Sequence, residues 1–236
     1  MKIIGHRGAA GLAPENTLAG IRAALEAGVD AIEFDIRKTL DGELVLCHDK
    51  SLLRTYGVDK IISETPYEVL RNIKGQNGER VPTLAEALRA VGDVEVLIEG
   101  KGEGWASPLA QKLNNYTDRA NFTVISFHHQ ELFIFGQKCP DIKLYANENY
   151  NAMDALNAAR LFGFEGIDVN FWVMNPLVYW LCKRHNLKVV VYTLNWPWMA
   201  QIFRLLYPTL AITTNLPNKL QFLRPKPKRT PKKRRL

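Results

Sequence analysis

The sequence predicts an α/β fold, a (β/α)8 barrel with a small insertion at about residues 50–80. Short apolar runs alternate along the chain with segments that have helical spacing. A length of 236 residues suits such a barrel as a single domain. Acids, histidines and basic residues gather where the predicted strands end, and barrel enzymes carry their chemistry at that end.

The predicted strands are the apolar runs 2–5, 31–36, 94–98, 122–127, 142–145, 166–169, 187–194 and 210–213. The predicted helices are 18–28, 84–91, 108–116, 132–138, 154–162, 176–185 and 199–206. Asn16 or Thr17 can cap the first helix, which Gly28 ends. The run 187–194 is strongly apolar, as expected of a strand covered on both faces. A turn at 40–43 precedes a further short run, 44–46.

Residues 50–80 interrupt this alternation. The segment is polar, contains glycine and shows neither helical nor strand spacing over most of its length. Barrel enzymes place insertions of this kind in loops beside the active site. We therefore expect it to lie near the candidate catalytic residues.

Charge is unevenly distributed along the chain. Residues 224–236 hold four Lys and four Arg and no acid, which leaves 23 basic and 24 acidic residues in the rest. We therefore predict a barrel domain over 1–223 and a basic, disordered tail over 224–236. Charge alone could give the tail weak contact with an anionic membrane surface. The nearly neutral body argues against a specific nucleic-acid partner.

The cysteines and the N-terminus bear on the compartment. Cys47, Cys139 and Cys182 are odd in number and widely spaced, which fits neither a zinc site nor a disulfide framework. The chain starts directly with a predicted strand and has no stretch resembling a secretory signal or long enough to span a bilayer. We expect a soluble, cytoplasmic protein.

Two acids in the second predicted strand indicate a cation site. Glu33 and Asp35 alternate with apolar residues, so both carboxylates share one face, and in a barrel strand that face points inward. Buried acids need a partner, and Glu99 at the end of the next barrel strand supplies a third carboxylate. Three carboxylates without a cysteine favour a hard divalent cation, with Mg²⁺ preferred and Ca²⁺ the alternative.

Several short motifs in order identify a family resemblance. They are His6-Arg7-Gly8, Ala13-Pro14-Glu15-Asn16-Thr17, Glu33-Phe34-Asp35, Asp41-Gly42, His48-Asp49 and, further on, Glu99-Gly100-Lys101. Together they resemble the glycerophosphodiester phosphodiesterase family nearly to residue 217. The resemblance implies that His6 and His48 are catalytic, that Arg7 and Lys101 bind phosphate, and that a divalent cation is used. It also implies a small insertion that covers the substrate.

The implied reaction is metal-dependent hydrolysis of a glycerophosphodiester to glycerol 3-phosphate and an alcohol, by acid–base catalysis with two histidines. We favour His6 as base and His48 as acid, although the sequence does not order them. The nucleophile is either water or the neighbouring glycerol hydroxyl. One alternative is lysophospholipase D-like cleavage, which needs an apolar groove from Leu52, Leu53, Tyr56 and Ile61. The other is an inactive barrel that serves as a binding module.

Two positions depart from the resembling family. The middle residue between Glu99 and Lys101 is usually apolar but here is Gly100, which could leave Lys101 loosely held. The last strand commonly ends in Thr-Asp, whereas Thr214 is followed here by Asn215. Four residues at late strand ends are candidates for the alcohol pocket: Phe127, Asn170, Trp172 and Asn195.

Overall fold

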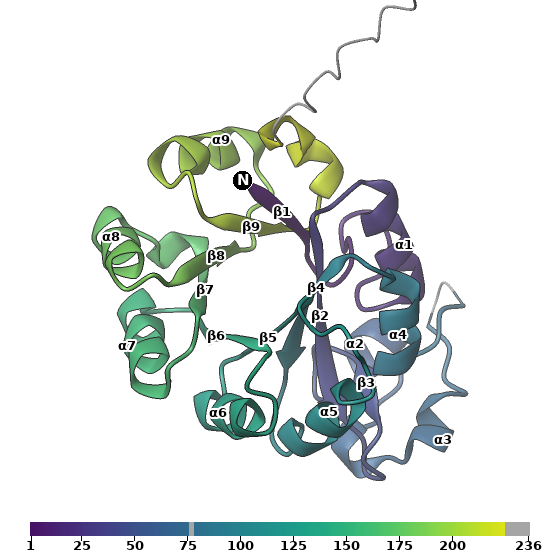
Figure 1. Ribbon diagram of the computed structural model, residues 1–236. Coiled ribbons are helices and arrows are strands. Elements are labelled where there is room, and N and C mark those ends of the chain that lie inside the picture. The colour runs from purple at the N-terminus through teal and green to yellow at the C-terminus, as the bar shows by residue number, and fades with distance from the viewer. Residues whose placement is uncertain (76–77, 225–236) are drawn as a thin grey trace, which may run out of the picture.

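A computed structural model describes residues 1–75 and 78–224 as a closed barrel of parallel strands surrounded by helices (Figure 1). The predicted fold is confirmed. The predicted tail, apart from Arg224, lies outside the described residues. Among the described helices, none combines the length and apolar character needed to cross a bilayer.

Nine strands form the sheet, and eight of them close the barrel. Parallel pairing runs through β1, β2, β4, β5, β6, β7, β8 and β9, and β9 returns to β1. The ninth strand, β3, is antiparallel to β2. Their bounds are β1 Lys2–Gly5, β2 Ala31–Lys38, β3 Leu44–Leu46, β4 Glu95–Gly100, β5 Phe122–Ser126, β6 Lys143–Glu148, β7 Gly166–Asn170, β8 Lys188–Tyr192 and β9 Ala211–Thr214.

Helices cover the outside of the barrel in sequence order. Their bounds are α1 Leu18–Glu26, α2 Leu53–Tyr56, α3 Tyr67–Leu70, α4 Leu84–Val91, α5 Ala106–Leu113, α6 His129–Lys138, α7 Ala152–Phe162, α8 Pro176–Arg184 and α9 Pro197–Leu206. Short 3-10 turns lie at η1 Ile62–Glu64, η2 Phe171–Val173 and η3 Pro217–Leu223. Thr17 caps α1 as predicted, by accepting a hydrogen bond from the backbone of Gly20 at 3.0 Å.

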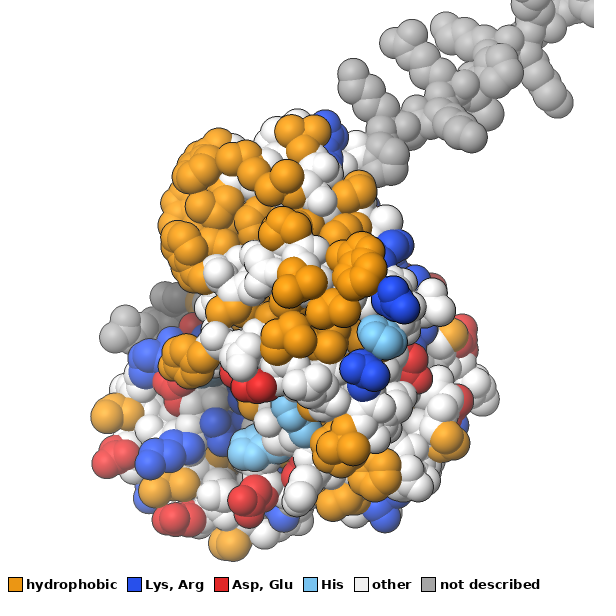
Figure 2. Space-filling view, turned by 90° about the vertical axis from the view of Figure 1, so that its left-hand side faces the viewer, with side chains coloured by type: hydrophobic (Ala, Val, Ile, Leu, Met, Phe, Trp, Pro, Cys, Tyr) orange, Lys and Arg blue, Asp and Glu red, His pale blue; other side chains and the backbone are white. Residues whose placement is uncertain are grey.

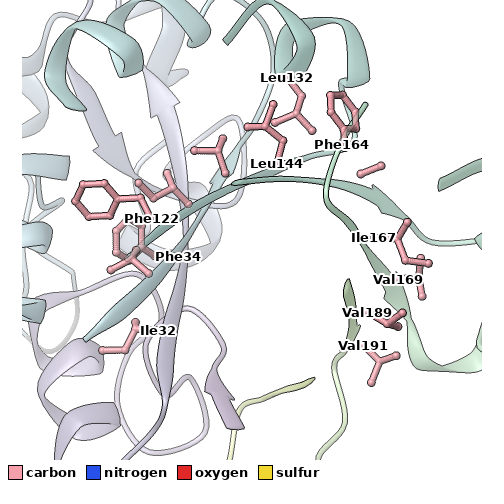
Figure 3. Close-up of a cluster of buried hydrophobic side chains, with 14 of the residues drawn as sticks. Ile32, Phe34, Phe122, Leu132, Leu144, Phe164, Ile167, Val169, Val189 and Val191 are labelled. Atoms are coloured by element: carbon pink, nitrogen blue, oxygen red, sulfur yellow. The ribbon is translucent and has the colours of Figure 1, made fainter. Parts of the chain in front are cut away.

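The main core lies between the strands and the helices. Ile32, Phe34 and Ile36 of β2 pack there together with side chains from the other strands and from the helices (Figure 3). The alternate residues Glu33 and Asp35 are also buried, although they do not belong to this core. The alternation in the sequence therefore separates a hydrophobic outer face from an acidic inner face, as predicted.

The insertion at 50–80 has a small core of its own. Leu52, Tyr56, Ile62 and Leu70 pack against Val45 and other residues next to β3. This explains why the segment shows little periodicity, because its apolar residues converge from two single-turn helices and a 3-10 turn. It also removes Leu52 and Tyr56 from the apolar groove considered for a lysophospholipid.

Strand boundaries agree with the sequence to within one to three residues. The largest difference is at β6, which ends at Glu148 and not at 145. A difference that bears on the site is at β4, which was predicted to end before Glu99 but continues through Gly100. Gly100 faces the fully buried indole of Trp105, and a Cβ at this position would overlap that ring. The indole of Trp105 therefore fills the space that a side chain at position 100 would occupy. Lys101 is not loose, since its side chain is only 13% exposed and pairs with two carboxylates.

We predict that Gly100→Ala lowers the free energy of unfolding by about 1–3 kcal/mol, because overpacking a close-packed interior forces its neighbours to move. Trp105→Leu should also destabilise the protein, since it leaves a cavity. The double variant should cost less than the sum of the single variants, because the smaller side chain makes room for the added methyl group. Urea unfolding of all four proteins measures this coupling. Strictly additive effects would contradict the contact.

Candidate active site

A cavity of about 550 Å³ opens at the carboxyl ends of the barrel strands. Its lining includes the sequence-predicted His6, Arg7, Glu33, His48, Glu99 and Lys101. The barrel strands β1, β2 and β4 and the antiparallel β3, which precedes His48, bring these residues together although they are as much as 95 positions apart. A second cavity of similar volume opens at the other end of the barrel, lined by groups such as Lys2 and Glu95, which pair with each other at 2.7 Å.

Three buried carboxylates form the centre of the site. Ligand oxygens of Glu33, Asp35 and Glu99 all lie within 4.8 Å of one another. Register explains part of this proximity, because Asp35 of β2 pairs directly with Glu99 of β4. Backbone N–H of Arg7 donates to Glu33 Oε2 at 2.8 Å, whereas Glu33 Oε1 is buried without a hydrogen-bond partner. This donor set fits a hard divalent cation.

Two basic side chains contact the carboxylates. Arg7 Nε lies 3.3 Å from Asp35 Oδ2, and Lys101 Nζ lies 3.3 Å from Asp35 Oδ1 and also contacts Glu99. Asn16 further holds Asp35 by donating from its amide at 2.8 Å. Two cations therefore face three carboxylates, and the charge that lacks a basic partner is on the Glu33 side.

Backbone conformation places Arg7 between the first and second strands. Its φ of 51° and that of Gly8, 86°, turn the chain so that the Arg7 N–H points at Glu33. A left-handed conformation is costly for an arginine, and such strain persists where the surroundings hold it. At Gly8 a Cβ would collide with the backbone of Gly20 in α1, so the His6-Arg7-Gly8 motif has a steric reason for its glycine.

Crowding of the carboxylates changes their protonation. Burial and the neighbouring acids raise the pKa of Glu33 well above its usual value, and burial raises the pKa of Glu99 to about 7. Burial also acts on Asp35, but Lys101 and Arg7 outweigh it and hold the pKa of that carboxyl below its usual range. The cluster therefore retains protons near neutral pH unless further positive charge reaches it.

His6 enters the cavity from the end of β1. Its Nδ1 lies 2.6 Å from Asn215 Oδ1, a carbonyl oxygen that can only accept, so Nδ1 carries the proton. Nε2 is then the unprotonated nitrogen, and it lies 3.9 Å from Glu33 Oε2. Burial and the nearby Arg7 lower the pKa of His6 to about 4. The departure at Asn215 thus gives His6 a neutral partner.

His48 also lines the cavity, and its partner is charged. Its Nδ1 is 2.7 Å from Asp49 Oδ1. Arg54 of α2 bridges Asp49 and Glu15, and Glu15 in turn pairs with Arg7 at 2.9 Å. Burial lowers the pKa of His48 as well, while the charge of Asp35 opposes that shift. The insertion therefore contributes Arg54 to a chain of ion pairs that runs from Asp49, beside His48, to Arg7.

The structure adds residues that sequence reasoning missed. Asp168 of β7 is 2% exposed, lines the cavity and has one oxygen without a partner; burial and Glu99 raise its pKa. It alternates with Ile167 and Val169 as the acids of β2 alternate with their neighbours, a pattern visible in the sequence. Tyr192 also lines the cavity and donates to Asn149 at 2.9 Å.

Other residues considered from the sequence have different positions. Phe127 and Asn170 line the cavity, and Lys101 lies over the Phe127 ring at 5.2 Å. Trp172 is 73% exposed, and Asn195 instead accepts hydrogen bonds from Thr214 and Asn215. Two further histidines that follow a barrel strand, His128 and His129, lie at the start of α6 and do not line this cavity.

Residues 6–219 match the sequence profile of the glycerophosphoryl diester phosphodiesterase family. The chain belongs to this family. A glycerophosphodiester phosphodiesterase from Caldanaerobacter subterraneus subsp. tengcongensis is 27% identical over 207 residues, which cover 82% of this chain and 85% of the relative. Membership identifies the chain as a phosphodiesterase of the hydrolase class, in a family that hydrolyses glycerophosphodiesters to glycerol 3-phosphate. The resemblance found in the sequence is confirmed.

Solved structures agree with this family assignment. An Oleispira antarctica phosphodiesterase, solved in complex with the product sn-glycerol-3-phosphate, is similar with a TM-score of 0.85 at 25% identity and covers 94% of this chain and 96% of that one. The glycerophosphodiester phosphodiesterase of Thermotoga maritima has the same fold, with a TM-score of 0.81 at 22% identity and coverage of 95% and 98%.

We predict that Glu99→Gln stabilises the protein in EDTA, increasingly so between pH 5 and pH 8. The pKa of Glu99 is about 7 in the folded protein and near 4.5 in the unfolded chain, so its contribution is present at low pH and is lost as pH rises through 7. Glutamine keeps the size and removes this loss. Melting temperatures of both proteins across this range provide the measurement. A difference that shrinks as pH rises would contradict the shift.

Proposed function

We propose that the chain hydrolyses glycerophosphodiesters to glycerol 3-phosphate and the head-group alcohol at the cavity around Glu33, Asp35 and Glu99. The observation that carries the proposal is that two histidines line the same cavity as a buried three-carboxylate cluster in a barrel of this family. Release of glycerol 3-phosphate from glycerophosphocholine, with and without EDTA, tests it. Absence of release in Mg²⁺ and in Ca²⁺ would favour a binding module instead.

Glu33, Asp35 and Glu99 would hold the divalent cation, for which Mg²⁺ is our first choice. The orphaned Glu33 Oε1 and the raised pKa values of Glu33 and Glu99 support this, because both indicate missing positive charge. When bound, a divalent cation polarises the phosphate oxygens and lowers the barrier to attack at phosphorus. Oxygen ligands alone favour Mg²⁺ or Ca²⁺ over softer metals.

Arg7 and Lys101 would bind the phosphate diester and neutralise charge that develops in the transition state. Both are directed at the cavity by their contacts with Asp35. The guanidinium of Arg7 is held from behind by Glu15, so its position does not depend on substrate. Lys101 is held by Glu99 and by the Phe127 ring. Such prior fixation reduces the entropy lost on binding.

Hydrogen bonds of the two histidines support His6 as base and His48 as acid. Nε2 of His6 is unprotonated and can take the proton of the nucleophile, either water or the neighbouring glycerol hydroxyl. His48 contacts the carboxylate of Asp49, which opposes the lowering of its pKa by burial and so supports the protonated ring needed to deliver a proton. The bond from phosphorus to the alcohol oxygen then breaks, and His48 protonates the departing oxygen. Attack by water gives glycerol 3-phosphate directly, whereas attack by the glycerol hydroxyl gives a cyclic phosphodiester that water must then open.

We predict that Glu99→Gln weakens activation by Mg²⁺ about tenfold or more, since ligand charge tunes the affinity of hard-cation sites. The concentration of Mg²⁺ that gives half-maximal activity is the measurement. Asp168→Asn is a matched control, because it neutralises a buried acid of the same cavity that we do not assign to the cation. An unchanged midpoint in the Glu99 variant would remove this residue from the site.

We predict that His6→Ala and His48→Ala each lower kcat by about 10²–10⁴-fold with little change in KM. The double variant should be only slightly slower than either single one, since the residues act as a unit. In a p-nitrophenyl phosphodiester the leaving group is p-nitrophenolate, a weak base that departs without receiving a proton. This substrate should restore the rate of His48→Ala but not that of His6→Ala.

His185→Ala provides the control for these variants, because His185 is an exposed histidine at the end of α8. Its rate should equal that of the wild-type protein on both substrates. Rescue of His6→Ala in place of His48→Ala would reverse the two roles. Failure to rescue either variant would assign both histidines to binding.

A further inference from the structure

An apolar surface on α8, α9 and the preceding turns has no partner within the described chain. Figure 2 shows hydrophobic side chains gathered over the upper part of this side of the molecule. Six large side chains define what we call the aromatic face: Trp172, Trp180, Trp196, Trp198, Ile202 and Leu205. Each is between 44% and 73% exposed. The protein has five tryptophans, and only Trp105 is buried.

Helix α9 shows why this exposure is unusual. Ala200 and Phe203 pack against the barrel, while Trp198, Ile202 and Leu205 follow each other at helical spacing on the exposed side. A surface helix normally presents polar residues to solvent, whereas α9 presents these three apolar side chains and has only Gln201 and Arg204 as polar residues. Large contiguous apolar patches on a protein surface commonly mark an interaction site.

The aromatic face adjoins the mouth of the active site. Phe171 lines the active-site cavity and is 6% exposed. Its ring lies 4.5 Å from that of Trp172 and 5.9 Å from that of Trp196. One buried aromatic residue therefore separates the catalytic cavity from the exposed tryptophans. Whatever covers this face also lies beside the opening through which substrate enters.

The charges of residues 169–236, which include the aromatic face, favour a negatively charged partner. Residues 169–236 contain thirteen Lys and Arg and no Asp or Glu. Seven of the thirteen belong to 225–236, and this segment continues from η3, which packs against α9. Arg184 lies over the Trp180 ring at 5.4 Å. The exposed tryptophans and an excess of positive charge thus belong to the same part of the sequence.

We propose that the aromatic face docks onto an anionic phospholipid membrane, with the basic C-terminal segment attracted to the lipid head groups. Tryptophan favours the boundary between hydrocarbon and head groups, because its ring is apolar while its N–H seeks a polar partner. Clustered Lys and Arg beside an apolar surface add attraction to anionic lipid. A second copy of the chain would bring the two Arg184 side chains beside the Trp180 rings towards each other, which opposes dimerisation through this face.

Vesicle binding by the full-length protein tests the proposal. We expect binding to vesicles of phosphatidylcholine with 30% phosphatidylglycerol at least tenfold tighter than to phosphatidylcholine alone. Binding should weaken when NaCl is raised to 0.5 M, because salt screens the charges. Brominated lipids should quench tryptophan fluorescence of the bound protein, since four of the five tryptophans lie at the proposed contact.

Substitutions on opposite sides of the barrel provide the decisive comparison. Trp198→Ser with Leu205→Ser should weaken vesicle binding about tenfold or more and reduce quenching, while activity on glycerophosphocholine is retained. The matched control is Leu40→Ser with Leu53→Ser, which removes two leucines that are 62% and 55% exposed near β3 and α2. These elements lie across the barrel from α8 and α9 (Figure 1). The control should bind as the wild type does.

Three results would overturn the proposal. Binding of the aromatic-face variant at wild-type strength would show that another surface docks. Bound protein without quenching would mean attachment through charge alone. A wild-type dimer that the same substitutions dissociate, measured by light scattering in the absence of vesicles, would show that a second copy covers the face. Because all three readouts are independent of turnover, they are separate from the test of the proposed reaction.

Discussion

Mutual repulsion among Glu33, Asp35 and Glu99 is the constraint on which the rest of the site depends. Their oxygens lie within 4.8 Å of one another in a buried position, where like charges are least tolerated. Arg7 and Lys101 compensate two of the charges, and the raised pKa values of Glu33 and Glu99 show that the compensation is incomplete. The strained backbone at Arg7 directs its N–H at Glu33, and the side-chain amide of Asn16 donates a hydrogen bond to Asp35.

The barrel makes such a cluster possible. Parallel pairing places Asp35 beside Glu99, and the same strands direct their alternate side chains into the helix-facing core. Burial of Ile32, Phe34 and Ile36 therefore holds the acids in place as a consequence of strand geometry. The insertion extends this support, because Arg54 links Asp49 to Glu15 and so connects the surroundings of His48 with those of Arg7.

The acids of the site and the exposed tryptophans belong to different parts of the chain, before and after residue 169. All carboxylate side chains of the site occur before residue 169. The later residues include Lys and Arg but no Asp or Glu, and they include the exposed tryptophans. Phe171 lies where the two parts meet. A membrane beside this residue would bring lipid-derived diesters to the cavity while the acidic cluster stays inside the barrel. The catalytic residues and the aromatic face are thus separate sets of residues that adjoin each other at Phe171.

The sequence by itself determined the barrel, the order of its elements and the inward direction of Glu33 and Asp35, because alternation and helical spacing are local properties of the chain. It also supplied His6, His48, Arg7, Glu99 and Lys101, through short motifs at strand ends. Only the tertiary structure decided which distant groups meet. Asn215 lies 209 positions from the His6 that it orients, and Asp168 faces Glu99 across the barrel. Likewise, α9 has apolar residues on more than one face, so only its packing against the barrel reveals which of them stay exposed. Such contacts follow from closure of the barrel, which no local pattern records.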